Sequence, residues 1–271
     1  MQLSLKRALF YVVVSTLVIS GVPWAGWGIY HYFLQSWQAD SAYQISAIIQ
    51  ETKTPSEVHR FYLQQLLDLS IDDPPNAYLY SWEKATRNLL QSPVIQEAQV
   101  RLWNPTTLLV RYEACRPVAY VGECRHLAID EKGQLIPSDP LYTPKRLPKV
   151  FLGLSSKEAS SSIWRQTIPT SQLAVQALRQ VSSLLSPNTS LLTLDLSRAF
   201  AESSGQREIV AVFREQWGEP VVRFNADYLE QGIEEYRALR RHFLRTTSER
   251  GTRPALVDLR SPGLGFYIPN S

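Results

Sequence analysis

The sequence predicts an α+β protein with a single N-terminal transmembrane helix, a small βααββ domain and a mainly antiparallel β domain that contains two helices. Three observations lead to this prediction: a long uncharged apolar segment, two helical patterns that precede a hairpin, and a series of short β-branched runs interrupted twice. Hydrophobic residues make up 44% of the 271 residues and charged residues 20%, which suits a folded core and excludes collagen-like, coiled-coil and disordered chains. The expected boundaries are a cytoplasmic tail at 1–7, the transmembrane helix at 8–34, the small domain at 43–113, the β domain at 114–268 and a tail at 269–271.

The first segment of the chain has the composition of a membrane anchor. Residues 8–38 contain no Asp, Glu, Lys or Arg, and the part from 8 to 34 exceeds the ~20 apolar residues that cross a bilayer, although Pro23 should kink or tilt it. Lys6 and Arg7 favour the cytoplasmic side, and the aromatic distal end favours the opposite headgroups. We therefore expect a single-pass protein of the cytoplasmic membrane, with its N-terminus inside and about 230 residues outside.

A cleaved signal peptide is the alternative to an anchor. Lys6 and Arg7, followed by the apolar run from Ala8 to Ile19, have the shape of its first two regions. The apolar character continues past Gly21, and no Ala-x-Ala-like cleavage site follows. These two features favour the anchor.

The segment after a polar connector predicts the small domain. Residues 43–49 read as a strand, and a helix should begin at Thr54 as N-cap with Pro55 at its first position and Glu57 completing a capping box. The apolar residues expected on that helix are Val58, Phe61, Tyr62, Leu66 and Leu69. A second helix should run from Ser81 to Pro93, and the alternating residues on either side of Asn104-Pro105 predict an antiparallel hairpin.

The remainder of the chain predicts the β domain. Short strands are expected at 117–121, 127–130, 135–136, 191–196, 209–213, 221–224 and 255–259. Two helices interrupt them, with Thr170 and Asn225 as their caps. Residues 155–162 are rich in Ser and should form a surface loop.

Motifs for catalysis, metals and cofactors are missing from the sequence. The four histidines are far apart, and no P-loop, G-x-G-x-x-G or G-x-S-x-G is present. The paired acids Asp72-Asp73 and Glu234-Glu235 read as a turn and a solvated helix face. Residues 40–271 hold 26 basic and 25 acidic side chains, so no phosphate-binding excess of charge is available for nucleic acid. We therefore expect no enzyme, no cofactor, no metal and no small-molecule substrate.

The two cysteines leave a disulfide open. An exported domain lies in an oxidising compartment, which favours a bridge between Cys115 and Cys124. If Gly122-Glu123 is a two-residue hairpin turn, Cys124 faces Val121 and Cys115 lies several residues further along the sheet, which opposes a bridge. A bulge near Pro117 could still bring the two together.

Short landmarks in order along the chain resemble the FtsQ/DivIB family of bacterial division proteins. They are Pro93-Val94-Ile95 before the strand 98–103, Tyr112-Glu113 before Arg116-Pro117-Val118-Ala119, Ala128-Ile129-Asp130 with Gly133, Leu147-Pro148 with Gly153, and Val257-Asp258-Leu259-Arg260. The resemblance spans nearly the whole chain and implies a POTRA domain at 43–113, followed by the family's β domain. The sequence departs from the family pattern at Val94, at Asn104 between Trp103 and Pro105, and at Ser261, where the family often has Tyr.

The resemblance also implies a docking strand. In the family, the strand after this Arg is an edge that pairs with FtsB or DivIC, itself complexed with FtsL. Here the corresponding residues are Ser261, Pro262, Gly263, Leu264, Gly265, Phe266, Tyr267 and Ile268. Leu264, Phe266 and Ile268 should share one face, with Gly265 and Tyr267 on the other. The plainer alternative is a terminal strand that only packs on its own sheet, and Asp258 with Arg260 should form a local ion pair.

The function implied by the resemblance is that of a non-catalytic divisome scaffold, located at the division site. It would recruit FtsB/DivIC-like and FtsL-like bitopic partners and use the POTRA domain for further contacts. A POTRA-type chaperone or translocation accessory for exported proteins is the alternative, because strand addition serves it equally well. The sequence shows no internal repeat of the small domain, which disfavours this alternative. A cell-wall enzyme would need a catalytic constellation that the sequence lacks.

Overall fold

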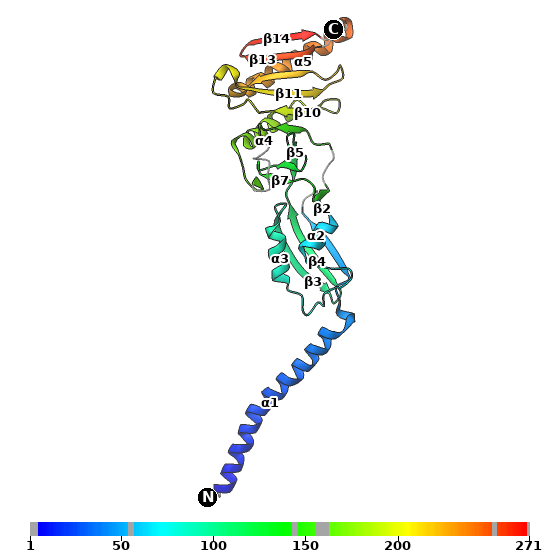
Figure 1. Ribbon diagram of the computed structural model, residues 1–271, viewed down its shortest axis with the longest axis vertical. Helices are drawn as coiled ribbons and strands as arrows, with labels where there is room; N and C mark the ends of the chain where they lie inside the picture. Colours follow the sequence, from blue (N-terminus) through cyan, green and yellow to red (C-terminus); the bar gives the residue numbers. More distant parts are fainter. Residues whose placement is uncertain (1–4, 54–56, 143–145, 156–162, 251–253, 270–271) are drawn as a thin grey trace. The chain divides into compact units, whose positions relative to one another are not determined.

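The computed structural model confirms a mixed α+β protein with one long apolar N-terminal helix and a large, mostly antiparallel sheet (Figure 1). It describes all residues except 1–4, 54–56, 143–145, 156–162, 251–253 and 270–271. The helices are α1 (Leu5–Ala39), α2 (Arg60–Leu66), α3 (Trp82–Gln91), α4 (Pro169–Ser182) and α5 (Leu229–Arg250), with short 3-10 turns η1 (Ser41–Tyr43), η3 (Ser204–Gln206) and η4 (Ala226–Tyr228). The strands are β1 (Ala47–Thr52), β2 (Glu57–Val58), β3 (Ile95–Asn104), β4 (Thr107–Ala114), β5 (Pro117–Val121), β6 (Leu127–Asp130), β7 (Leu135–Pro137), β8 (Leu141–Tyr142), β9 (Lys149–Phe151), β10 (Ser190–Asp195), β11 (Glu208–Arg214), β12 (Val221–Asn225), β13 (Pro254–Ser261) and β14 (Leu264–Pro269).

Helix α1 is the only described helix that is long and apolar enough to cross a membrane. The qualifying stretch runs from Leu9 to Gln38 and covers 30 residues, four residues beyond the expected end at Leu34. Pro23 lies inside the helix. Its large apolar side chains are exposed, as a lipid-facing surface requires.

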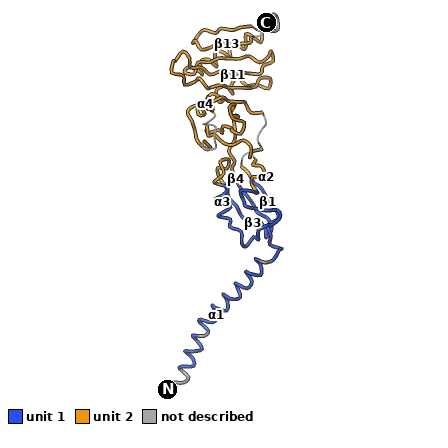
Figure 2. Tube along the Cα trace, in the orientation of Figure 1, with its two compact units in different colours: residues 1–51, 64–89, 98–111 blue, residues 52–63, 90–97, 112–271 orange. Residues whose placement is uncertain are grey.

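The chain divides into two compact units, which Figure 2 distinguishes by colour. Unit 1 contains residues 1–51, 64–89 and 98–111, and unit 2 contains residues 52–63, 90–97 and 112–271. A three-stranded sheet has the order β1-β4-β3, and the two-residue turn between β3 and β4 makes them the predicted antiparallel hairpin. Ser81 caps α3 as expected, since its Oγ accepts a hydrogen bond from the Lys84 N–H at 3.3 Å.

The structure corrects the start of the small domain. The expected strand at 43–49 begins only at Ala47, after the 3-10 turn η1. The expected cap Thr54 and Pro55 lie outside the described residues, but Glu57 and Val58 form strand β2 and pair with β8, so the helix begins later, at Arg60. Val58 is fully buried and its N–H donates to the Tyr112 hydroxyl at 3.1 Å, and this long-range burial outweighs the local helical pattern.

The larger sheet has nine strands in the order β14-β13-β12-β11-β10-β9-β5-β6-β7. It consists of three antiparallel blocks, β5-β6-β7, β10-β11-β12 and β13-β14. Parallel pairings join the blocks: β9 pairs with both β5 and β10, and β12 pairs with β13. Helices α4 and α5 contribute to one continuous core with these strands, and the largest buried side chains in that core include Tyr236, Phe213 and Phe224.

Two helix starts differ in detail from the expectation. Helix α4 begins at Pro169, so Ile168 is its N-cap residue and Thr170 is not. Ser171 performs the capping: its Oγ accepts from the Ile168 N–H at 3.1 Å. Asn225 is a cap as predicted, but for η4, which leads directly into α5; its Oδ1 accepts from the Asp227 N–H at 2.8 Å.

Both cysteines are free thiols. The expected register around them is wrong, because Tyr120 pairs with Ala128 and the loop between β5 and β6 therefore holds five residues instead of two. Cys124 lies in that loop, partly buried against the core, while Cys115 is buried near Gln96, whose amide lies 3.4 Å from its Sγ. Burial raises the pKa of the Cys115 thiol, which disfavours the reactive thiolate.

Candidate functional site

The residues expected to bind a partner lie in the C-terminal hairpin at one edge of the nine-stranded sheet. Ser261 is the last residue of β13, Pro262 and Gly263 form the turn, and the five residues from Leu264 to Ile268 lie in β14. Gly263 has a φ of +78°, a conformation that favours glycine. Strand β14 is the outermost strand of the sheet, with β13 as its neighbour.

One face of β14 packs on helix α5. A Cβ placed on Gly265 would lie 3.1 Å from the Leu239 and Leu259 side-chain tips, so glycine permits this close approach. The Tyr267 ring meets the Phe243 ring edge-on, with centroids 5.5 Å apart. The hairpin turn is tied to the same helix, because the Gly263 N–H donates to Glu235 Oε1 at 2.9 Å.

The opposite face of β14 carries large apolar side chains that are open to solvent. Leu264 is 61% exposed, Phe266 64% and Ile268 58%. The strand register continues this apolar row across the sheet, because Ile268 pairs with Leu256 and Leu256 with Val221, both of which are only partly buried. An edge strand with such a face offers unpaired backbone groups and a ready apolar surface to an incoming strand.

A second row on the same face contains charged side chains. Phe266 pairs with Asp258, and Asp258 pairs with Arg223. The Arg260 guanidinium holds the Asp258 carboxylate through two bonds of 2.9 and 2.8 Å, so the predicted ion pair is present. Glu208, which is 5% exposed, accepts from Arg223 Nε at 2.9 Å.

The charged row is slightly positive. Glu208 also lies 3.4 Å from Arg260 and 3.3 Å from Arg198, so two carboxylates face three guanidinium groups. Burial raises the pKa of the Asp258 carboxyl, but the hydrogen bonds and charge of Arg260, with the charge of Arg223, outweigh burial and hold that pKa below its usual value. Hydrogen bonding to Asp258 raises the pKa of Arg260. Both groups are therefore ionised at neutral pH, and among the described residues of this row the guanidinium groups outnumber the carboxylates by one.

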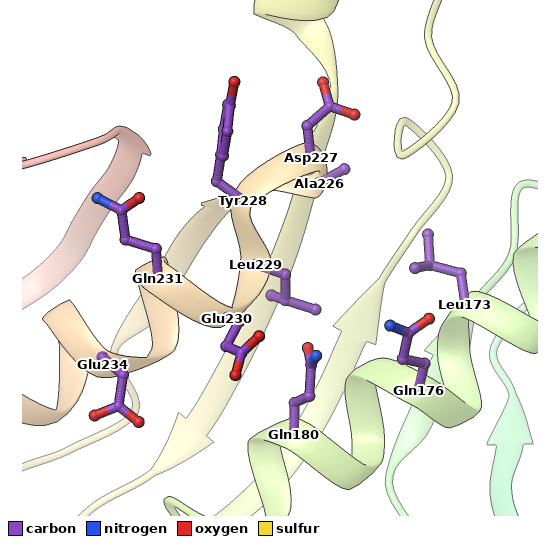
Figure 3. Close-up of a pocket in the computed structure, with 10 residues that line it drawn as sticks. All are labelled: Leu173, Gln176, Gln180, Ala226, Asp227, Tyr228, Leu229, Glu230, Gln231 and Glu234. Atoms are coloured by element: carbon purple, nitrogen blue, oxygen red, sulfur yellow. The ribbon is translucent and has the colours of Figure 1, made fainter.

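A depression of about 530 Å³ lies between α4 and the start of α5 (Figure 3). Its lining includes the amides of Gln176 and Gln180 and the carboxylates of Asp227, Glu230 and Glu234. Within the described part of the chain, no group of three or more His, Cys, Asp or Glu is placed to hold a metal ion. The depression presents carboxylates, amides and the Tyr228 hydroxyl, whereas the edge strand presents a row of exposed apolar side chains, so the apolar edge remains the stronger candidate site.

Part of the apolar and charged surface was not expected from the sequence. Leu256, Val221 and Glu208 share the open face with strand β14. Alternation within each strand indicates which side chains share a face, but the register between strands brings these residues together. That register depends on pairings between segments far apart in the sequence, so no local pattern reveals it.

Comparison of the sequence with models of protein families finds no match, and comparison with curated proteins finds none either.

Proposed function

We propose that this chain is a membrane-anchored, non-catalytic scaffold of the FtsQ/DivIB kind. It recruits a bitopic partner resembling FtsB or DivIC, with its FtsL-like companion, by strand addition at β14. In this proposal α1 anchors the protein in the cytoplasmic membrane with its N-terminus inside, and the protein acts at the division site.

The observation that carries the proposal is the exposed apolar face of an edge strand. Leu264, Phe266 and Ile268 are each more than half exposed, and they stand on a strand whose other face is fixed by α5. A partner strand would extend the sheet through backbone hydrogen bonds and cover these side chains. The charged row on the same face, with Arg198, Arg223 and Arg260 around two carboxylates, favours an acidic side chain on the partner.

Two further observations support the scaffold. Helix α1 meets the length and composition of a membrane span, and an anchor raises the effective concentration of partners held in the same membrane. The order β1, α2, α3, β3, β4, with the short β2 added, supports a POTRA domain, which we propose makes further divisome contacts.

Co-purification from membranes tests the proposal. The tagged full-length chain is compared with Phe266→Glu, which places a charge on the open face, and with Phe200→Glu as the matched control. Phe200 is 59% exposed and also belongs to unit 2, but it lies outside the candidate site. Mass spectrometry identifies what each chain retains, and limited proteolysis verifies that both variants are folded.

The expected result is a small bitopic coiled-coil protein retained by the wild type and by Phe200→Glu, and lost from Phe266→Glu. Retention of that partner by Phe266→Glu would show that the scaffold docks its partner elsewhere. Recovery of unfolded exported chains alone would instead favour the chaperone or translocation accessory.

A further inference from the structure

Three segments of unit 1 meet where α1 ends. The chain leaving α1 (40–46) pairs with the segment 75–80, because the Ala77 N–H donates to the Tyr43 carbonyl at 2.9 Å and the Ile45 N–H to the Pro75 carbonyl at 3.0 Å. The end of β3 with the β3–β4 turn (103–106) joins them, because the Ser46 N–H donates to the Thr106 carbonyl at 2.9 Å. We call residues 40–46, 75–80 and 103–106 together the span-proximal surface.

The end of α1 is packed on this surface. The Trp37 ring stacks on the Tyr78 ring, with centroids 5.5 Å apart and planes 25° from parallel. The Asn76 amide donates to the Trp37 carbonyl at 2.9 Å and to the Asp40 carbonyl at 3.2 Å, which satisfies carbonyl groups at the helix end. The span and the surface are therefore joined by specific contacts.

The length of α1 keeps the span-proximal surface near the headgroups. Its apolar stretch of 30 residues measures about 45 Å, and a bilayer with both headgroup layers measures about 40–45 Å. With the inner hydrocarbon boundary at Leu9, at most about two turns of the helix stand clear of the outer headgroups, and any tilt shortens that distance.

The composition of the span-proximal surface suits the headgroup layer. Trp103 is 64% exposed, Leu79 63% and Tyr78 45%. Amphipathic aromatic rings favour this layer of the bilayer. The three segments contain one charged residue, Asp40, and no Lys or Arg. This surface therefore offers no basic side chain to attract anionic lipid.

We propose that the span-proximal surface rests on the outer leaflet of the membrane, with Trp103, Tyr78 and Leu79 inserted among the lipid headgroups. The inference rests on the membrane span of the proposed function and adds a second, lipid-facing contact outside the span. The contact is with headgroups that carry no net charge and with the upper part of the acyl chains. Together with α1, the three side chains hold unit 1 against the bilayer.

Spin-label depth measurements on the full chain in vesicles test this proposal. In a background with both cysteines changed to Ala, single cysteines at Leu79, Trp103, Gln99 and Ile19 carry a nitroxide. Gln99 is the matched control, because it is exposed on the same face of β3 as Trp103 and lies four residues, or about 13 Å, from it. Ile19 is the reference for the span itself. The vesicles are pure phosphatidylcholine, or phosphatidylcholine mixed with phosphatidylglycerol.

The expected ratio of oxygen collisions to nickel-chelate collisions is several-fold higher at Leu79 and Trp103 than at Gln99, and highest at Ile19, in both kinds of vesicle. Labels at Leu79 and Trp103 as aqueous as the one at Gln99, with Ile19 embedded, would overturn the inference and leave the span intact. An aqueous Ile19 would overturn both the span and the inference. A requirement for phosphatidylglycerol would also overturn the inference, because charge would then make the contact.

Discussion

Exchange of Arg240 for Met is expected to destabilise unit 2 strongly. Arg240 lies on α5, and its side chain is 18% exposed beside the Glu215 side chain, which is 1% exposed. The guanidinium donates to Glu215 Oε2 at 3.0 Å, to the Leu184 carbonyl at 2.8 Å and to the Thr189 hydroxyl. Its Nε lies 2.9 Å from Glu215 Oε1 without the alignment of a hydrogen bond, so charge attraction dominates that contact.

The cost follows from what the substitution leaves behind. Without Arg240, the buried Glu215 carboxylate keeps the Thr189 hydroxyl as a donor at 2.9 Å and the Tyr236 hydroxyl nearby, and neither of them carries a positive charge. Removing one member of a buried ion pair costs about 3–5 kcal/mol, against a total stability of about 5–15 kcal/mol. Burial already raises the pKa of Glu215 despite its partners, and the loss of Arg240 raises it further. A carboxyl whose pKa is raised in the folded state contributes stability that is present at low pH and lost as the pH rises through the folded-state pKa. The loss of unfolding free energy in Arg240→Met should therefore become smaller as the pH is lowered.

Urea-dependent hydrogen exchange of the β11 amides, followed by mass spectrometry of the full chain in detergent, measures this stability within unit 2. Arg214→Met is the matched control. Arg214 lies in β11, and its ion pair with Glu219 is exposed and contributes at most about 1 kcal/mol. The double substitution of Arg240→Met with Glu215→Leu should recover most of the loss, since it removes the unpaired charge. A loss in Arg240→Met no larger than that in Arg214→Met would refute the reasoning.

Three further outcomes are expected. Asp258→Asn should weaken the dependence of stability on pH below about pH 4. A carboxyl whose pKa is lowered in the folded state contributes stability that is present above its unfolded-state pKa and lost as the pH falls. A melting temperature that falls with acid as steeply in the variant as in the wild type would contradict this. Gly265→Val should cost about 1–3 kcal/mol in thermal unfolding by overpacking Leu239, whereas Gly205→Val, with open space around it, should not. Ser171→Ala should lower the melting temperature by removing the cap of α4, at about 1–2 kcal/mol, and a melting temperature equal to that of the wild type would argue against the cap.

Local signals in the sequence predict much of the secondary structure. The strands β5, β6, β11 and β12 lie within a residue or two of their expected bounds, because each has a β-branched run closed by turn residues. The helix α3 begins at its expected cap because Ser81 and the following apolar spacing act over one turn. Where local interactions determine a helix or strand, the sequence pattern is sufficient to predict its bounds.

Interactions between distant segments explain the differences. Val58 follows a helical pattern, yet its burial against Tyr112 makes it part of a strand. The five-residue loop around Cys124 is set by the register of β5 on β6, which a two-residue turn signal at Gly122 did not reveal. In the candidate site, alternation predicts the two faces of β14, whereas the neighbours Leu256 and Glu208 depend on pairing across the sheet.

The nine-stranded sheet alternates antiparallel blocks with parallel pairings that join them, and this order affects how parts of the sheet fold and locally unfold. Within a block, partners such as Tyr120 and Ala128 are close in sequence, so the block can form rapidly; across a joint, partners such as Val221 and Leu256 are separated by the whole of α5. The hairpin β13–β14 can therefore separate from β12 as one cooperative subunit while β10–β12 stays paired. A partner strand added to β14 would then lengthen this subunit and slow its opening, so hydrogen exchange in β13 reports whether the edge is occupied.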